Sequence, residues 1–270
     1  MTATRALPAT PAGCVAFVGA GPGQADLITL RGAQRLAQAA VVLSDALADP
    51  ALRELAPLAR WLHVGKRGFA DSTGQQVINA LLIKSAREVG PAGLVVRLKG
   101  GDPSVFGRLE EELQAMAAAG IACEVVPGVT AALAAAASAQ RPLTRRGAGR
   151  SVSFATAMTA AVGDAQALPA GRSADTEVFY MAGKQLAALS RRLVRAGWPG
   201  NADVCVVSHA GWPDELISDH TVATLGRASM LHAGRPTVVV VGAGAHPLNK
   251  VGSPANDMAC APACAPLATH

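Results

Sequence analysis

A glycine-rich turn between an apolar run and a helical pattern is the feature that most constrains the fold of this chain. Residues 14–18 (Cys-Val-Ala-Phe-Val) are typical of a buried strand, which ends at the turn Gly-Ala-Gly-Pro-Gly of residues 19–23. After the turn, apolar residues recur at helical spacing between Leu27 and Ala40, and residues 41–43 (Val-Val-Leu) form the next apolar run. This order of strand, helix and strand predicts a βαβ unit with a parallel sheet.

The alternation of short apolar runs and helical patterns continues along the chain and is that of an α/β protein. Before residue 140, it predicts strands at 61–64, 94–98 and 123–126, and helices at 77–88, 108–119 and 130–139. After residue 150, it predicts strands at 152–156, 177–181, 204–208 and 237–241, and a helix at 184–196.

A break at residues 140–143 (Gln-Arg-Pro-Leu) separates the two sets of elements. We therefore expect an N-terminal α/β domain over residues 13–139 and a C-terminal α/β domain over residues 140–246. Residues 1–12 are rich in Ala, Thr and Pro, and residues 247–270 are rich in Pro and Ala, so we expect a disordered tail at each end.

Composition and charge exclude several classes of function. Half of the 270 residues are hydrophobic, so the chain can bury the core of one large or two small domains. No apolar run reaches about 18 residues without a charge or a Pro or Gly break, and residues 1–11 lack the apolar stretch of a secretory signal. We expect a cytoplasmic protein without a membrane partner.

The charge and the aromatic content bear on the partner. Aromatic residues make up 3% of the chain, which argues against the stacking platforms that bind single-stranded nucleic acid. The net charge of +5 suits an anionic small substrate, although a merely basic surface explains it equally well.

Neither the cysteines nor the histidines show the spacing of a metal site or a disulfide framework. The five cysteines are scattered, and Cys260 and Cys264 form a loose pair in the tail without partners at a zinc-ligand spacing. The six histidines show no ligand spacing either, so we expect them in loops or at the surface, and we expect no metal cofactor.

The glycine turn alone leaves three interpretations open, namely a ligand-binding loop, a dinucleotide-binding loop and a purely structural turn. Glycines let a ligand approach the backbone, and parallel sheets bind ligands at the carboxyl ends of their strands. Asp45 follows Gly23 by about 20 residues, near the place of the ribose-binding acid in dinucleotide folds. That fingerprint nevertheless fails, because Gln24 replaces its third glycine and Pro22 cannot donate a backbone N–H.

A longer motif at residues 97–108 narrows these alternatives. It reads Arg-Leu-Lys-Gly-Gly-Asp-Pro-Ser-Val-Phe-Gly-Arg. The glycines, the aspartate and the proline predict a stiff loop after a strand. The guanidinium of Arg108, at the end of the motif, is suited to binding a carboxylate. Acidic residues at the start of the following helix suit its dipole, so electrostatic capping is one interpretation of Glu110, Glu111 and Glu112.

Together with the glycine turn, this motif resembles the tetrapyrrole methylases. The resemblance implies two α/β domains of the tetrapyrrole methylase type, with the active site in the cleft between them, and a homodimer. It covers roughly residues 13–245. Further motifs occur in the same order: Asp-Leu-Ile-Thr-Leu at 26–30, Val-Gly-Lys-Arg at 64–67, Gln75, Ile-Asn at 78–79, Val-Pro-Gly-Val-Thr-Ala at 126–131, Pro-Leu-Thr at 142–144, Phe-Tyr-Met at 179–181, Pro236 and Val-Val-Gly at 240–242.

The resemblance also implies an activity. The chain would transfer methyl groups from S-adenosyl-methionine to uroporphyrinogen III, giving precorrin-2 through precorrin-1 on the routes to sirohaem and cobalamin. Asp45 and Lys66 fall on positions proposed as proton acceptor and donor. Substrate-side positions and cofactor contacts carry across by motif as well. They are Arg108, Glu111 and Arg146 for the substrate, and Pro22, Gly100, Gly101, Asp102, Thr130, Ala131, Met181, Ala210 and Thr237 for the cofactor.

Structural interpretations of three of these residues stay open. Asp45 also suits a turn at a strand end, Lys66 a solvated loop, and Met181 a core position in a strand. The alternatives for the whole chain are a methyltransferase of a later corrin precursor, or a catalytically weak protein of this fold that binds the cofactor or a tetrapyrrole. They stay open because the chain departs from the family pattern on the substrate side, at Ser44, Ala46, Ser104, Leu109, Glu110 and Arg145.

Overall fold

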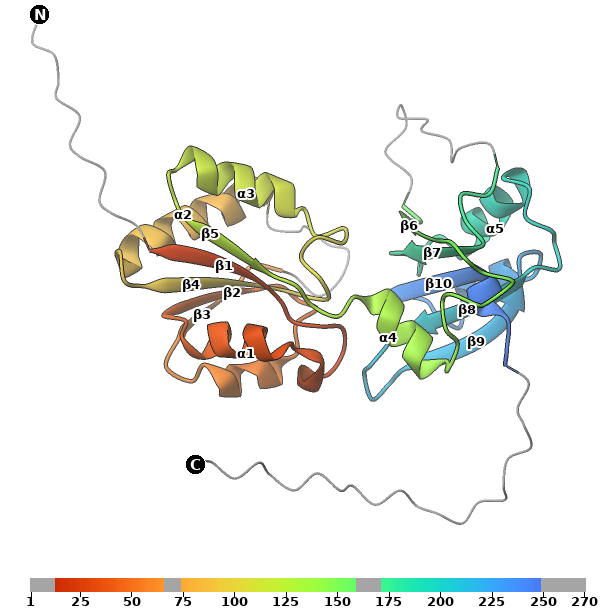
Figure 1. The fold of residues 1–270 in the computed structure, drawn as a ribbon, viewed down its shortest axis with the longest axis horizontal. Coiled ribbons are helices and arrows are strands. Elements are labelled where there is room, and N and C mark those ends of the chain that lie inside the picture. The colour runs from red at the N-terminus through yellow and green to blue at the C-terminus, as the bar shows by residue number, and fades with distance from the viewer. Residues whose placement is uncertain (1–12, 66–73, 159–170, 249–270) are drawn as a thin grey trace, which may run out of the picture.

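The computed structural model describes residues 13–65, 74–158 and 171–248, and these form two five-stranded sheets. Helix α4 (Ala131–Ser138) follows the last strand of the first sheet and packs against one face of the second sheet (Figure 1). Several expectations fall outside the described residues and stay predictions. They concern Lys66, the Cys260 and Cys264 pair, the tail at 1–12, and the tail at 247–270 apart from residues 247 and 248.

The N-terminal sheet is parallel throughout, as the βαβ pattern predicts. Its strand order is β3-β2-β4-β1-β5, and each neighbouring pair is parallel. The loops that follow β1, β4 and β5 therefore leave adjacent strands at the same edge of the sheet. The strands are β1 (Cys14–Gly19), β2 (Val41–Ser44), β3 (Arg60–His63), β4 (Leu94–Lys99) and β5 (Cys123–Val126), and the helices are η1 (Ala25–Leu27), α1 (Leu30–Ala37), η2 (Pro50–Leu55), α2 (Gln75–Val89) and α3 (Leu109–Ala118).

Alternate residues of the parallel strands face opposite layers of helices. Val15 and Phe17 of β1 belong to the buried cluster that α2 and α3 complete, whereas Ala16 and Val18 belong to the cluster that α1 and η2 complete. Figure 1 shows these helices on the two faces of the sheet. Burial on both faces explains why the strands appear in the sequence as continuous apolar runs.

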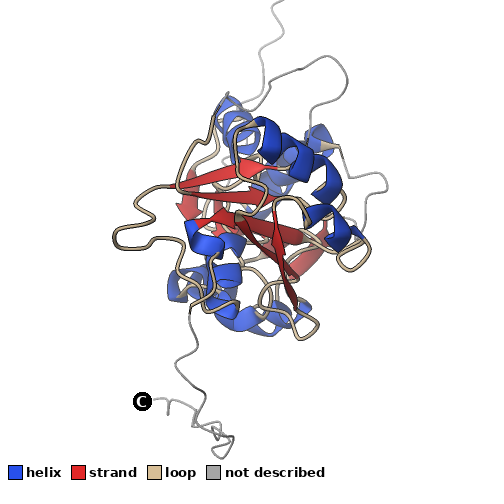
Figure 2. Ribbon diagram, turned by 90° about the vertical axis from the view of Figure 1, so that its right-hand side faces the viewer, coloured by secondary structure: helices blue, strands red, loops and turns tan. Residues whose placement is uncertain are grey.

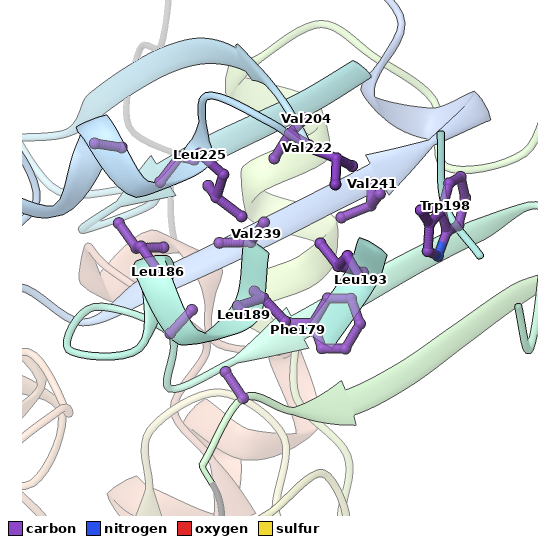
Figure 3. Packing of buried hydrophobic residues seen from close by; sticks show 14 of the residues in the cluster. Phe179, Leu186, Leu189, Leu193, Trp198, Val204, Val222, Leu225, Val239 and Val241 are labelled. Carbon is purple, nitrogen blue, oxygen red and sulfur yellow. The ribbon is translucent and has the colours of Figure 1, made fainter. Parts of the chain in front are cut away.

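The C-terminal sheet is mixed, in the order β6-β7-β10-β8-β9. The pair β6–β7 is parallel and the other three pairs are antiparallel. Phe179 and Val239 face α5 and η3 on one side, as Figure 3 shows, and α4 covers the other side. Figure 2 shows helices on both sides of these strands. The elements are β6 (Val152–Thr156), β7 (Thr176–Tyr180), α5 (Leu186–Arg195), β8 (Asp203–Ser208), β9 (Leu216–Thr221), η3 (Leu225–Ser229), β10 (Thr237–Gly242) and η4 (Ala243–Ala245).

The predicted strands and helices are present, with ends that differ by a few residues, but two details differ from the sequence pattern. Strand β9 was not predicted, because its Ser-Asp-His segment is polar; pairing with β8 along six positions holds it at the sheet edge. Placing Met181 in a strand was wrong, since β7 ends at Tyr180 and Met181 has a left-handed φ of 56°. The expected domain boundary between residues 139 and 140 stays a prediction.

No helix among the described residues has the length and hydropathy needed to cross a membrane.

Candidate functional site

Three glycine loops meet at the carboxyl edge of the parallel sheet, and a larger residue does not fit where they touch. A Cβ on Gly19 would lie 2.6 Å from the Cα of Gly128 and 2.7 Å from the carbonyl oxygen of Gly101. A Cβ on Gly128 would collide with the same oxygen and would lie 2.8 Å from the Cα of Gly19. The glycine turn, the motif loop after β4 and the loop after β5 therefore pack backbone against backbone.

Hydrogen bonds join the same loops. The backbone N–H of Gly101 donates to the carbonyl of Gly21 at 2.9 Å, and the N–H of Gly21 donates back to Gly101 at 3.3 Å. The carboxylate of Asp102 accepts bonds from the backbone N–H of Gly128 at 2.9 Å and of Ser104 at 2.8 Å. The two motifs that the sequence singles out are thus in direct contact.

Asp45 connects the loop after β2 to this site. Its Oδ2 accepts a bond from the N–H of Gly100 at 2.9 Å, and its Oδ1 accepts one from the N–H of Leu47 at 3.0 Å. Asp45 also lines a cavity of about 370 Å³. The turn that the structural interpretation expects is therefore present, and the same residue lines a space that a substrate group can enter.

Three predicted cofactor residues lie at one edge of the C-terminal sheet. Met181 follows β7, Ala210 follows β8, and Thr237 begins β10. Because β10 runs antiparallel to both neighbours, its start lies beside their ends, and Thr237 is paired with Ser208. The N–H of Ala182 donates to the carbonyl of Thr237 at 3.1 Å. The sheet topology thus groups residues that are far apart in the sequence.

The two halves of the chain meet at these loops. The hydroxyls of Thr130 and Tyr180 share a buried hydrogen bond of 2.7 Å. The N–H of Gln24 donates to the carbonyl of Gly211 at 3.1 Å, and a Cβ on Gly23 would lie 2.7 Å from the Cα of Gly211. The loops that carry the predicted cofactor residues of both halves are therefore neighbours.

Apolar side chains around Tyr180 are exposed at this junction. The ring centres of Phe106 and Phe154 lie 5.0 Å and 5.7 Å from the ring centre of Tyr180. Both phenylalanines and Met181 are between 42% and 45% exposed. Burial raises the pKa of Tyr180, so its hydroxyl keeps its proton at neutral pH. Apolar side chains beside polar loops are typical of a small-molecule site.

The predicted substrate-side residues do not form one cluster. Arg108 donates to both carboxylate oxygens of Glu111 at 2.7 Å, and this pairing lowers the pKa of Glu111. Arg146 is exposed in the turn between Arg145 and Gly149 of the C-terminal half. Among the described residues, no hydrogen bond or ion pair joins Arg146 to the other two.

The described part of the chain contains no group of three or more His, Cys, Asp or Glu side chains arranged to hold a metal ion. The cysteines in that part, Cys14, Cys123 and Cys205, are free thiols, and burial raises the pKa of Cys205 to about 11.

A buried ion network beneath the motif loop was not predicted. The carboxylate of Glu112 is fully buried and accepts bonds from Arg97 at 3.0 Å and from Lys99 at 2.5 Å. Burial, followed by the charge of Arg97, lowers the pKa of Lys99. Helix capping therefore does not account for Glu112. The signal in the sequence was the pair Arg97 and Lys99, which share one face of a buried strand and so require a buried acid.

A second buried network supports Thr237. His232 lies in a turn, as one of the two expectations for the histidines has it, but its side chain is fully buried and so is not at the surface. The Ser208 hydroxyl lies 2.7 Å from Nδ1 of His232 and 2.7 Å from the Thr237 hydroxyl. Ser218 bonds the other ring nitrogen at 2.8 Å. The imidazole thus fixes the hydroxyl groups at this edge of the sheet.

We expect acid to destabilise the protein through His232. Burial, followed by the charges of His220 and Arg235, lowers the pKa of His232 from 6.5 to about 4 in the folded state. Between these values the unfolded chain binds more protons than the folded chain, so the free energy of unfolding falls as the pH falls. The expected loss between pH 7 and pH 5 is about 2 kcal/mol. Urea denaturation at both pH values measures it, and a His232→Gln variant with the parent's full acid sensitivity would contradict this assignment.

The sequence matches one family of known proteins over most of its length. The family described as Tetrapyrrole (Corrin/Porphyrin) Methylases matches residues 14–226. Siroheme synthase 1 of Yersinia pseudotuberculosis is 43% identical over 234 residues, which are 85% of this chain and 48% of that protein. The siroheme synthase of Neisseria meningitidis is 40% identical over 232 residues, with the same coverage. The chain thus spans about half the length of these curated relatives.

Solved structures share the fold. Uroporphyrin III C-methyl transferase from Thermus thermophilus superposes with a TM-score of 0.73 at 33% identity, over 85% of this chain and 97% of that chain. The same values hold for the Thermus protein complexed with S-adenyl homocysteine. A cobalt precorrin-4 methyltransferase gives a TM-score of 0.73 at 28% identity, over 86% of this chain and 96% of that one. The fold class expected from the sequence is confirmed.

Proposed function

Because the chain belongs to the tetrapyrrole (corrin/porphyrin) methylase family, we propose that it methylates carbon atoms of uroporphyrinogen III with S-adenosyl-methionine as the donor. The product would be precorrin-2, formed through precorrin-1, which leads to sirohaem and cobalamin. The siroheme synthases at 43% identity support this reaction. The Thermus methyltransferase supports it as well, since the match covers 97% of the Thermus protein.

The observation that carries the proposal is the meeting of the glycine loops with the ends of β7 and β8 at the junction of the two halves. We propose that the methyl donor binds there. The backbone at Gly101 is open to a ligand, since an added Cβ would find its nearest neighbour, the carbonyl oxygen of Val129, 3.9 Å away. Open backbone and exposed apolar side chains fit the polar and flat parts of this donor. The proposed contacts are Pro22, Gly100, Gly101, Asp102, Thr130, Ala131, Met181, Ala210 and Thr237.

The residues of this chain mainly supply alignment. When bound, the donor offers an electrophilic sulfonium methyl group for attack by a pyrrole carbon. Holding the reacting atoms in line is worth about 7–11 kcal/mol of the barrier. The tight backbone packing of Gly19, Gly101 and Gly128 favours such alignment, because these loops have little freedom to move. We propose that Asp45 accepts the proton that leaves the macrocycle after methylation.

The remaining roles are proposals that come from the family resemblance. Lys66 would donate a proton. The residue before it, Gly65, lies close to Asp45: a Cβ added to Gly65 would lie 3.0 Å from the Asp45 Cα. Arg108, Glu111 and Arg146 would face the substrate. A homodimer is proposed on the same ground, whereas a cytoplasmic location stays the expectation drawn from the sequence pattern.

Replacing Asp45 with asparagine is expected to lower kcat by about 10²–10⁴, because the carboxylate that takes the proton is lost. Asp49 offers a matched control. It borders the same cavity and accepts two backbone bonds, from Ala25 at 3.0 Å and from Ala51 at 2.9 Å. Initial rates of methyl transfer should fall in Asp45→Asn and hold in Asp49→Asn. Equal losses in the two variants would leave Asp45 with a structural role alone.

The reaction is tested by incubating the purified chain with S-adenosyl-methionine and anaerobically prepared uroporphyrinogen III, followed by mass spectrometry of the tetrapyrrole. Two added methyl groups are the expected result, and a single one indicates an impaired second step. Binding of the donor without a change in mass favours a binding protein of this fold. Tight binding of NAD instead would overturn the cofactor assignment.

A second candidate is methylation of a later corrin precursor. The cobalt precorrin-4 methyltransferase supports it, with a TM-score equal to that of the Thermus enzyme. Its lower identity, 28% against 33%, favours uroporphyrinogen III. Repeating the mass measurement with a later corrin precursor as substrate separates the two, because this candidate predicts an unchanged uroporphyrinogen III and a methylated corrin precursor.

A further inference from the structure

The cavity of about 370 Å³ beside Asp45 lies at the carboxyl ends of β2 and β3. Its lining includes Ser44, Arg53, Trp61 and His63. The chemistry proposed above uses none of these four side chains. They nevertheless border the cavity that Asp45 also lines, where a substrate group would lie for proton transfer to that residue.

Two contacts hold the Arg53 guanidinium at this cavity. It lies 5.4 Å from the ring centre of Trp61, and its Nη2 donates to Nε2 of His63 at 2.7 Å. Since arginine has no acceptor, Nε2 of the imidazole accepts and Nδ1 carries the ring proton. Nδ1 then donates to the hydroxyl oxygen of Ser44 at 2.9 Å. The guanidinium is thus fixed by a stacked ring on one side and an ordered chain of hydrogen bonds on the other.

The two carboxylates at the cavity have more hydrogen-bond partners than the guanidinium of Arg53. Asp45 and Asp49 also line the cavity, but each carboxylate already accepts two backbone N–H bonds of 2.9–3.0 Å. Arg53 makes the one hydrogen bond to His63, and among the described residues no carboxylate forms an ion pair with it. Arg53 is exposed, so the remaining N–H donors of its guanidinium are accessible to an anionic group that enters the cavity.

We propose that this cavity is a subsite for a carboxylate side chain of the tetrapyrrole, with Arg53 as its ligand and with Trp61 and His63 as positioning residues. The inference rests on the proposed function, because uroporphyrinogen carries acetate and propionate groups around its ring. A planar guanidinium binds a carboxylate through paired, directional hydrogen bonds. Capture of one such group here fixes the edge of the macrocycle beside Asp45.

The test compares Arg53→Ala with Arg60→Ala. Arg60 begins the same strand as His63 and pairs with Glu88 at the surface at 2.6 Å, so its loss removes an equal charge away from the cavity. We expect Arg53→Ala to raise the KM for uroporphyrinogen III about 10- to 100-fold, with the KM for the methyl donor unchanged. Arg53→Lys should restore part of the affinity, and Arg60→Ala should match the parent.

Titration with uroporphyrin III separates a failure of this inference from a failure of the proposed function. This oxidised ring carries the same carboxylates, and its binding, followed by fluorescence, requires no turnover. Weaker binding by Arg53→Ala, with an unchanged urea midpoint, supports the subsite. If the parent methylates its substrate and Arg53→Ala binds uroporphyrin III as tightly as Arg60→Ala does, the subsite alone is overturned. A parent that neither methylates nor binds the ring overturns both proposals.

Discussion

Replacing Gly128 with alanine is expected to weaken the binding of S-adenosyl-homocysteine by up to about 100-fold. The added Cβ would collide with the carbonyl oxygen of Gly101 and would lie 2.8 Å from the Cα of Gly19. Both neighbours are backbone atoms of adjacent loops, so the clash is relieved only if the loops move apart. A 100-fold loss corresponds to about 2.8 kcal/mol, near the upper end of the 1–3 kcal/mol that overpacking of a folded structure typically costs. Isothermal titration calorimetry measures the change.

Gly120 provides the control for this variant. It follows helix α3 with a φ of 69°, and no atom lies within 4 Å of the position where its Cβ would be built. Gly120→Ala should therefore cost about 1 kcal/mol of stability through backbone strain and leave ligand binding intact. If Gly128→Ala binds S-adenosyl-homocysteine as tightly as Gly120→Ala does, the packed loops are not part of the cofactor site.

Replacing Glu112 with glutamine is expected to lower the free energy of unfolding by about 3–5 kcal/mol, because two buried cations lose their shared counter-charge. Arg97 and Lys99 are both within 3.0 Å of this carboxylate, and the three side chains are almost completely buried. Urea denaturation measures the loss. Glu110→Gln is the matched control, since Glu110 is exposed on the same helical turn and bonds Gln114 at 3.2 Å. A loss below about 1 kcal/mol in Glu112→Gln would contradict the network's role.

The stability of this variant should also depend on pH. Burial already lowers the pKa of Lys99 in the parent, while Glu112 acts in the opposite direction. Without that carboxylate the folded-state pKa falls further below the unfolded value. Between the two values the unfolded chain binds more protons, so the free energy of unfolding of Glu112→Gln should rise with pH across this interval, more than in the parent.

Most of the fold was predictable from the sequence because burial of strands and helices leaves a regular pattern of apolar residues in it. The strands at 14–18, 41–43 and 94–98 are apolar on both faces apart from the buried Arg97, and helices cover both faces of their sheet. Strand β9 escaped prediction for the converse reason. It lies at a sheet edge, and its order comes from backbone pairing with β8, which side-chain hydropathy does not report.

The candidate site was predictable only where chemistry is concentrated in short motifs. The turn at 19–23 and the motif at 97–108 could be identified singly, and their contact through Gly21 and Gly101 follows from the parallel order of β1 and β4. Side-chain contacts between separate elements could not be predicted in the same way. The link from Arg53 through His63 to Ser44 joins residues from separate elements, and the sequence pattern assigned none of them to a common site.

The most direct test is a crystal structure of the protein with S-adenosyl-homocysteine bound. We expect the ligand at the junction of the two halves, touching Gly101 and Thr130 from the first and Met181 and Ala210 from the second. Density confined to one half, or placed away from the contact between Gly21 and Gly101, would contradict the proposed site and the methyl transfer that depends on it.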